Sequence, residues 1–314
     1  MVNRRHLRIK VLQAVYGFFQ DPDTPLKTAE ENLLTSIEKI YDLYLFQLAL
    51  GIELLHESYR EREEAKNKYF PTPDDLMPET NFTRNRILNA LNTSESLQTL
   101  LQKKKINWLK NLDIPQKIFR KVRLSDGYKA YFKKENPTMN DDREFMLWMY
   151  ENFIFNDDIL ESYYEELNIH WADDIYVVNA AVLKTLRTAE ENKPLKLISL
   201  FKDKEEDTEF CLTLFRKTIL HEAEYEEMIR NKAQNWEVDR IAMMDIILMK
   251  MALAEILEMP SIPVKVTLNE YIDLSKLFST PKSNAFVNGI LDKLVAEFKS
   301  QNRIVKVGRG LIDQ

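Results

Sequence analysis

Four residues near the start of the chain have side chains suited to binding a nucleic acid. Arg4 and Arg8 are four residues apart and would share one face of a helix, with Arg5 beside them. Guanidinium groups stay charged and bind phosphate through paired hydrogen bonds, and an aromatic ring such as Tyr16 can stack on an unpaired base. Such side chains could bind single-stranded RNA. The alternative is that the arginines form a solvated helix end and that Tyr16 belongs to the core.

A second candidate site is the run Lys282-Ser283-Asn284-Ala285-Phe286, at the start of the expected last helix. A helix N-terminus offers free N–H groups and a partial positive charge to phosphate. Ser283 and Asn284 can hydrogen-bond to RNA, Lys282 adds a positive charge, and Phe286 adds a ring. The alternative is that Ser283 and Asn284 only cap the helix and that Phe286 is buried.

Residue patterns typical of catalysis or metal binding are weak. No two of the six glycines have the spacing of a nucleotide-binding loop, and Cys211 lies in an apolar stretch, which favours an inert core thiol. The four histidines are far apart and lack zinc-site spacing: His6, His56, His170 and His221. The sequence therefore predicts no catalytic residue, no metal and no cofactor.

The composition indicates a large helical chain with a segregated charge. Its 314 residues carry a net charge of −6, yet from Leu101 to Lys134 there are eleven basic residues against two acidic ones. Trp108, Phe119 and Tyr128 are interleaved with these bases. Such a stretch can follow single-stranded nucleic acid, but it also fits the solvated and buried faces of ordinary helices.

The single cysteine fits a reducing compartment, and we find neither a signal-peptide pattern nor an apolar run long enough to span a membrane. The sequence therefore predicts a cytoplasmic protein.

Apolar residues recur with helical periodicity along the chain, and we see no strong strand signal. The first helix should end near Asp21-Pro22. The other expected helices lie at about 41–69, 82–92, 94–110, 115–134, 139–155, 157–168, 171–190, 210–235 and 238–258, and after these Thr267 and Thr280 are expected to cap the last two helices.

Three stretches, in order along the chain, carry a family resemblance. They are Arg4-Arg5-His6-Leu7-Arg8 with the following Val11 to Tyr16, the run Leu248 to Ile256, and the segment from Ile262-Pro263-Val264 through Asn269-Glu270-Tyr271 to Phe286-Val287-Asn288-Gly289-Ile290-Leu291-Asp292-Lys293. Together they resemble the NusB family of transcription antitermination factors. The resemblance covers about the first twenty residues and the last hundred.

The resemblance implies an all-α, NusB-like fold of two packed helical sub-bundles with a large helical insertion in the N-terminal half. Residues 1–20 with about 206–235 would form the N-terminal sub-bundle, about 21–205 the insertion, and 236–314 the C-terminal sub-bundle with a basic tail. It also implies RNA binding by Arg4, Arg5, Arg8 and Tyr16, and by the Lys282–Phe286 run.

The partners that the resemblance implies are boxA-like single-stranded RNA, the ribosomal protein NusE and the RNA polymerase antitermination complex, which promotes read-through in ribosomal RNA operons. Asp245 matches an acidic residue of the family near the NusE or RNA face. Its alternative roles are a satisfied buried carboxylate or part of a polar face.

Two other classes of function stay open. NusB-like domains occur fused to RNA cytosine methyltransferases, but this chain lacks the glycine-rich loop and the loop cysteine of such an enzyme. The other alternative is a non-catalytic protein–protein scaffold or dimer that has lost RNA binding, which the acidic region between Glu135 and Glu227 makes conceivable.

Overall fold

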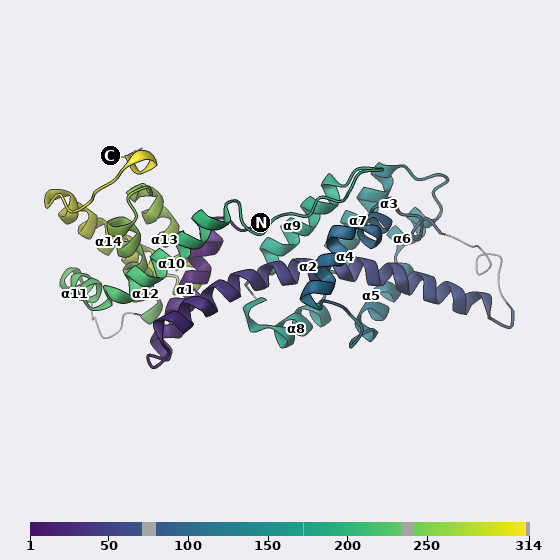
Figure 1. Ribbon diagram of the computed structural model, residues 1–314, viewed down its shortest axis with the longest axis horizontal. Helices are drawn as coiled ribbons and strands as arrows, with labels where there is room; N and C mark the ends of the chain where they lie inside the picture. The colour runs from purple at the N-terminus through teal and green to yellow at the C-terminus, as the bar shows by residue number, and fades with distance from the viewer. Residues whose placement is uncertain (71–79, 172, 234–241, 312–314) are drawn as a thin grey trace. The chain divides into compact units, whose positions relative to one another are not determined.

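The computed structural model describes residues 1–70, 80–171, 173–233 and 242–311. Within these ranges the chain is built from α-helices and short 3-10 segments, with no strand (Figure 1). The prediction of an all-α fold is confirmed.

The chain divides into two compact units. Residues 38–200, with Met1, form one unit, which we call the insert unit; residues 2–37 and 201–314 form the other, the terminal unit. Helix α2 (Leu26–Lys66) contributes residues to both. The predicted insertion at about 21–205 is close to the insert unit, and the further division of the terminal residues into two sub-bundles stays a prediction.

Aromatic side chains attach the insert unit's other segments to α2 by hydrogen bonds to its backbone carbonyls. The Tyr150 hydroxyl donates to Gln47 O at 3.0 Å, and the Trp171 indole donates to Lys39 O at 2.8 Å. In addition, α7 packs against α3, α5, α6 and α9. The helices are α3 (Arg86–Thr93), α4 (Glu95–Lys104), α5 (Asp113–Leu124), α6 (Asp126–Phe132), α7 (Met139–Phe153), α8 (Asp158–Leu167) and α9 (Ile175–Thr188).

Helix α12 is the core of the terminal unit. Every residue from Ile247 to Ile256 is buried, as expected of a helix that is apolar around its whole circumference. It packs against each of the other five helices of the unit. The six described helices that lie wholly within the unit are α1 (Arg4–Gln20), α10 (Lys204–Leu220), α11 (Glu222–Lys232), α12 (Met243–Glu258), α13 (Val264–Phe278) and α14 (Ser283–Ser300).

Several predicted helix boundaries are confirmed and others are wrong. Helix α1 ends at Gln20, directly before Asp21-Pro22. By contrast, α2 starts at Leu26 rather than near Tyr41. The predicted helix 115–134 is two helices, because the Ser125 hydroxyl accepts the backbone N–H of Tyr128 and starts α6. The predicted helix 210–235 breaks at His221, and its residues 234 and 235 lie outside the described residues.

Both predicted N-caps of the last two helices are wrong. Helix α13 begins after Pro263, and Thr267 lies inside it, where its hydroxyl donates to the Glu255 carboxylate at 2.8 Å. Thr280 instead opens a turn whose carbonyl accepts from Ser283 N, so α14 starts at Ser283. Thr267 therefore bonds a buried carboxylate instead of capping α13, and Thr280 belongs to the turn that precedes α14.

Two helical glycines differ in what surrounds them and give a matched pair of variants. A Cβ at Gly51 in α2 would lie 2.6 Å from the buried Tyr150 hydroxyl, whereas a Cβ at Gly17 in α1 would meet nothing within 4 Å. We expect Gly51→Ala to destabilise the protein, because an overpacking cost of about 1–3 kcal/mol exceeds the gain in helix propensity. Gly17→Ala should stabilise it by about 0.5–1 kcal/mol. Urea unfolding followed by circular dichroism measures both, and equal stabilisation by the two variants would contradict this account.

Candidate nucleic-acid interface

The first turn of α1 places the three N-terminal arginines. Asn3 caps the helix: its side-chain oxygen accepts the backbone N–H of His6 at 3.1 Å, and the His6 ring accepts from Asn3 N at 3.5 Å. Burial, and then the charge of Arg5, lower the pKa of His6, which favours the neutral ring that this cap requires. The cap fixes where the helix begins and therefore the directions in which the arginines point.

Arg8 points into the protein. Its side chain is 3% exposed, and its Nε and Nη2 atoms donate to the two carboxylate oxygens of Glu255 in α12, at 2.8 and 2.7 Å. Burial lowers the pKa of Arg8, but the hydrogen bonds and charge of Glu255 outweigh it and leave the pKa raised. Glu255 also accepts from Thr267 and from Tyr271, whose hydroxyl lies 3.3 Å away. This burial leaves Arg8 little surface for RNA, and the ion pair gives it a structural role.

Arg5 lies at the surface beside α13. Its Nε and Nη2 donate to the Glu270 carboxylate at 3.0 and 2.9 Å, and Nη2 also donates to Asp273 at 2.9 Å. The hydrogen bond to Glu270 is the main reason that the pKa of Arg5 is raised. Because 41% of its side chain is exposed, Arg5 is oriented by acids and still accessible.

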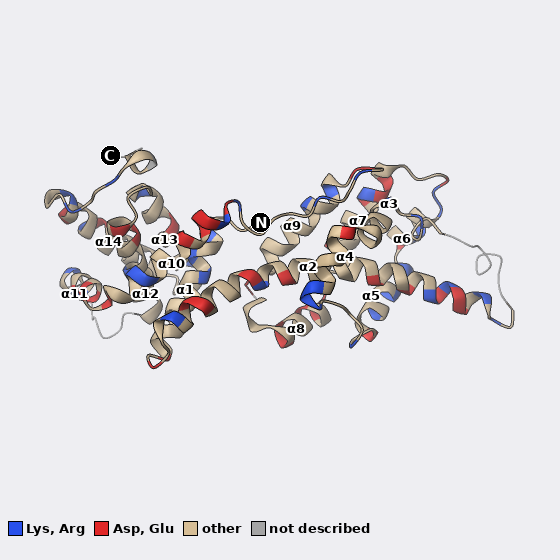
Figure 2. Cartoon of the chain, in the orientation of Figure 1, with Lys and Arg blue, Asp and Glu red and all other residues tan. Residues whose placement is uncertain are grey.

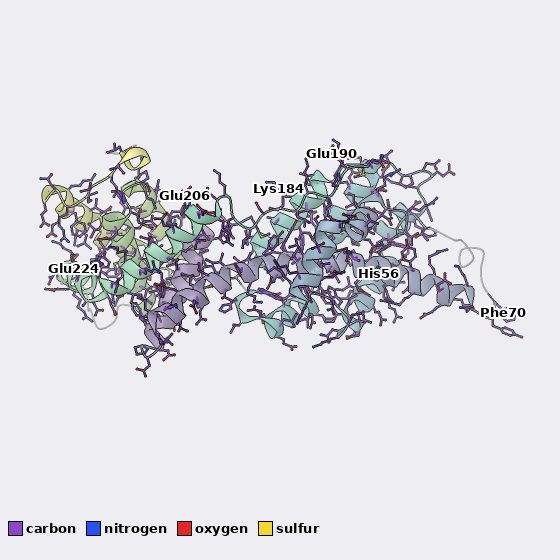
Figure 3. All side chains as sticks on the ribbon, viewed as in Figure 1. His56, Phe70, Lys184, Glu190, Glu206 and Glu224 are labelled. Atoms are coloured by element: carbon purple, nitrogen blue, oxygen red, sulfur yellow. The ribbon has the colours of Figure 1, made fainter. Side chains whose placement is uncertain are left out.

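Arg4 is the first residue of α1, and its side chain lies against the start of α10. Acidic residues fill the first turn of α10 (Figure 2). Arg4 Nη2 donates to Glu206 at 2.6 Å, its Nε lies 3.4 Å from Asp207, and its guanidinium is 4.4 Å from the centre of the Phe210 ring. Figure 3 labels Glu206 on α10. With 32% of its side chain exposed, Arg4 is also reachable from solvent.

The three arginines line one cavity of the terminal unit, of about 990 Å³. Its walls combine these basic groups and their carboxylate partners with apolar side chains that include Phe210, Ile262 and Val266. The structure therefore brings together the arginines that the sequence analysis singled out. Such a wall can hold phosphate by its guanidinium groups and an apolar or aromatic group beside them.

The sequence analysis missed the acidic partners Glu206, Asp207, Glu270 and Asp273. Glu270 and Asp273 are three residues apart on α13, a spacing that places two carboxylates on one helix face. That spacing was readable in the sequence, but its pairing with Arg5 depends on how α1 packs.

The other predicted site residues do not line this cavity. Tyr16 is exposed on α1. Lys282 is exposed before α14, Asn284 is partly exposed and its side chain accepts the backbone N–H of Ala285, and Phe286 is buried. Their predicted roles in RNA binding stay predictions.

Ser283 and Asp245 form an internal contact between α14 and α12. The buried Ser283 hydroxyl donates to Asp245 Oδ2 at 2.7 Å, and Asp245 is itself 4% exposed. Its Oδ1 lies buried with no hydrogen-bond partner among the described residues. Asp245 therefore joins two helices from the inside, and the role predicted for it at a partner face stays a prediction.

Chemically reactive groups in the described residues are few. Burial raises the pKa of the Cys211 thiol to about 12. Across the described ranges, no three histidine, cysteine or acidic side chains are grouped as a metal site would need. In the same ranges no helix has the length and apolar character to cross a membrane.

The terminal unit is thus a helical domain with an arginine-lined cavity held by α1, α10 and α13. A family model described as the NusB family matches residues 175–296, which include α9 of the insert unit and all the helices from α10 to the greater part of α14. The match begins within the segment that the sequence analysis assigns to the insertion.

Three relatives bear the name "Transcription antitermination protein NusB". Those from Salinibacter ruber and Chloroherpeton thalassium are 42% and 41% identical over 33% of this chain, and the matches cover 65% and 50% of those proteins. The relative from Desulforapulum autotrophicum is 34% identical over 33% of this chain and 78% of its own length. The chain belongs to the NusB family. It spans less than two thirds of the first two relatives, and no solved structure matches it.

Removing the carboxylate charge of Glu255 tests the buried pair. We expect Glu255→Gln to lower the free energy of unfolding by about 3–5 kcal/mol, because the buried Arg8 charge then keeps only the Glu270 carboxylate, 3.5 Å from its Nη1, as a counter-charge. The control is Glu206→Gln at the exposed Arg4 pair, which should cost less than about 1 kcal/mol. Urea unfolding measures both, and equal effects would show that the buried pair has no special weight.

The Cys211 thiol should be unreactive in the folded protein. With its pKa raised to about 12 by burial, almost none of it is thiolate at pH 8. We expect no reaction with Ellman's reagent at pH 8 in buffer and reaction of one thiol per chain in 8 M urea. Rapid reaction of the folded protein would contradict the inert role.

Proposed function

We propose that this chain is a transcription antitermination factor that binds RNA and is not an enzyme. It binds boxA-like single-stranded RNA together with the ribosomal protein NusE, within the RNA polymerase antitermination complex, and promotes read-through in ribosomal RNA operons. The observation that carries the proposal is the cavity lined by Arg4, Arg5 and Arg8 in a chain of the NusB family.

Arg4 and Arg5 are the residues that we assign to the RNA phosphates. Both are partly exposed at the cavity, and their carboxylate partners hold each guanidinium in a defined orientation. An oriented arginine loses less side-chain entropy on binding than a free one. Arg8 acts indirectly, because its ion pair with Glu255 holds the start of α1 in place.

Tyr16, Lys282 and Asn284 are the further RNA contacts in this proposal. Tyr16 offers an exposed ring for stacking on a base, and Lys282 adds an exposed charge beside the N-terminus of α14. Phe286 and Ser283 act from the interior, since both are buried. We likewise assign Asp245 an indirect role in partner binding, in which it holds the start of α14 through Ser283.

A protein–protein scaffold is the second candidate. It is favoured by one specific observation: each of the three arginines already has a carboxylate partner, so RNA phosphates must compete with Glu206, Glu270 and Glu255. A scaffold of this kind would keep the fold and would not bind RNA.

Fluorescence anisotropy with a labelled boxA-like RNA, with and without NusE, tests the proposal. We expect Arg4→Ala/Arg5→Ala to weaken RNA binding at least tenfold. It should also make the dependence of log Kd on log salt shallower by about 1 to 2, because two phosphate contacts are lost.

The control is Lys27→Ala/Lys184→Ala, which removes two exposed charges outside the cavity. It should leave the affinity within a factor of two, and melting curves by circular dichroism verify that both proteins fold. Wild-type protein that binds no RNA at any salt concentration, with or without NusE, would rule out the antitermination proposal. In that case the scaffold reading would be preferred.

A further inference from the structure

The insert unit holds a second basic pocket, separate in its residues from the arginine cavity. It has a volume of about 510 Å³ and lies among α2, α5 and α6. Its lining comprises Ser58, Glu61, Arg62, Ala65, Thr80, Phe119, Arg123, Tyr128, Lys129, Phe132 and Lys133. Six of these eleven residues thus come from the basic and aromatic stretch between Leu101 and Lys134.

The lining carries a surplus of positive charge. Arg62, Arg123, Lys129 and Lys133 face one acid, Glu61, among the described lining residues, which gives a formal charge of 4 − 1 = +3. Glu61 lies 3.2 Å from Arg123, so these two charges offset each other. Lys129 is likewise paired, with Asp126 at 3.4 Å, so Arg62 and Lys133 are the bases that favour an anion.

Arg62 is the residue that points most directly to a ligand. Its Nε and Nη2 atoms lie buried with no hydrogen-bond partner among the described residues. Arg8 uses the same two atoms to hold Glu255, and Arg5 uses them to hold Glu270. A buried charged donor without an acceptor is costly, and this edge of a guanidinium matches two oxygens of a phosphate. This edge is closed to solvent as well as unpartnered, so a phosphate reaches it only when the side chains around Arg62 move aside.

Aromatic rings lie in the same pocket. The rings of Tyr128 and Phe132 are 6.2 Å apart and nearly parallel, at 26°. Tyr128 is buried, whereas Phe132 is partly exposed and can receive a further flat ring. Base–aromatic stacking beside a basic groove is a common means of binding single-stranded nucleic acid.

We propose that this pocket binds single-stranded RNA, with one phosphate on Arg62 and the adjoining base on Phe132. The insert unit would then supply a second RNA contact in addition to the arginine cavity. This inference rests on the proposed function for the ligand class, but it uses a different set of residues.

Photo-cross-linking separates the two sites. The 314-residue chain is titrated with a hexanucleotide of 4-thiouridine and irradiated, and cross-linked peptides are quantified by mass spectrometry. We expect the peptide that contains Tyr128 and Phe132 to carry the nucleotide. Arg62→Gln should raise the RNA concentration needed for half-maximal cross-linking at least fivefold. Lys133→Gln should also raise this concentration measurably. Because Lys133 is exposed, its substitution disturbs the fold less than that of Arg62.

Two controls accompany these variants. Lys184→Gln removes a charge from α9, outside the pocket (Figure 3), and should change nothing. Arg4→Ala/Arg5→Ala should leave cross-linking at this peptide within a factor of two. That result separates failure of the arginine cavity from failure of this pocket.

Competition identifies the source of the phosphate. If inorganic phosphate or uridine monophosphate displaces the hexanucleotide at equally low concentration, the pocket is a small-anion site and the RNA assignment is overturned. Absence of any cross-link at this peptide, or a cross-link that is unchanged in both Arg62→Gln and Lys133→Gln, also overturns it.

Discussion

The buried ion pair between Arg8 and Glu255 is the constraint on which the terminal unit depends. Both side chains are removed from water, and each charge depends mainly on the other for its stability there. The pair joins α1 to α12, and the hydroxyls of Thr267 and Tyr271 bring α13 to the same carboxylate. Helix α1 must therefore meet the consecutive helices α12 and α13, more than 200 residues later in the chain, at one point and in one register.

That meeting point determines what lies at the surface. Since Arg8 fixes the rotation of α1, Arg5 reaches Glu270 on α13 and Arg4 reaches Glu206 on α10. Ion pairs at such exposed positions contribute little stability, so their main effect is to orient the guanidinium groups. Of the three arginines at the start of α1, Arg8 is therefore structural, whereas Arg4 and Arg5 are accessible to solvent.

The insert unit uses polar groups differently. Its long helix α2 accepts hydrogen bonds from tyrosine and tryptophan side chains at its main-chain carbonyls, so large rings are buried with their polar atoms satisfied. The edge of Arg62 is among the buried polar groups of this unit that have no hydrogen-bond partner within the described residues; Gln47 Oε1, Arg143 Nε and the Tyr164 hydroxyl are others. In a unit that satisfies most of its polar atoms internally, an unsatisfied guanidinium beside other bases is a feature that requires an explanation outside the chain.

The sequence by itself determined the helical class and the end of α1 before Asp21-Pro22. These follow from local periodicity and from proline, which act over a few residues. Only the tertiary structure decided that Arg8 is interior while Arg4 and Arg5 are accessible. The three side chains are chemically identical, so the sequence alone does not tell them apart. The tertiary structure likewise placed Thr267 against Glu255 and Ser283 against Asp245, since a hydroxyl caps a helix or meets a buried carboxylate according to which acceptor long-range packing brings near it.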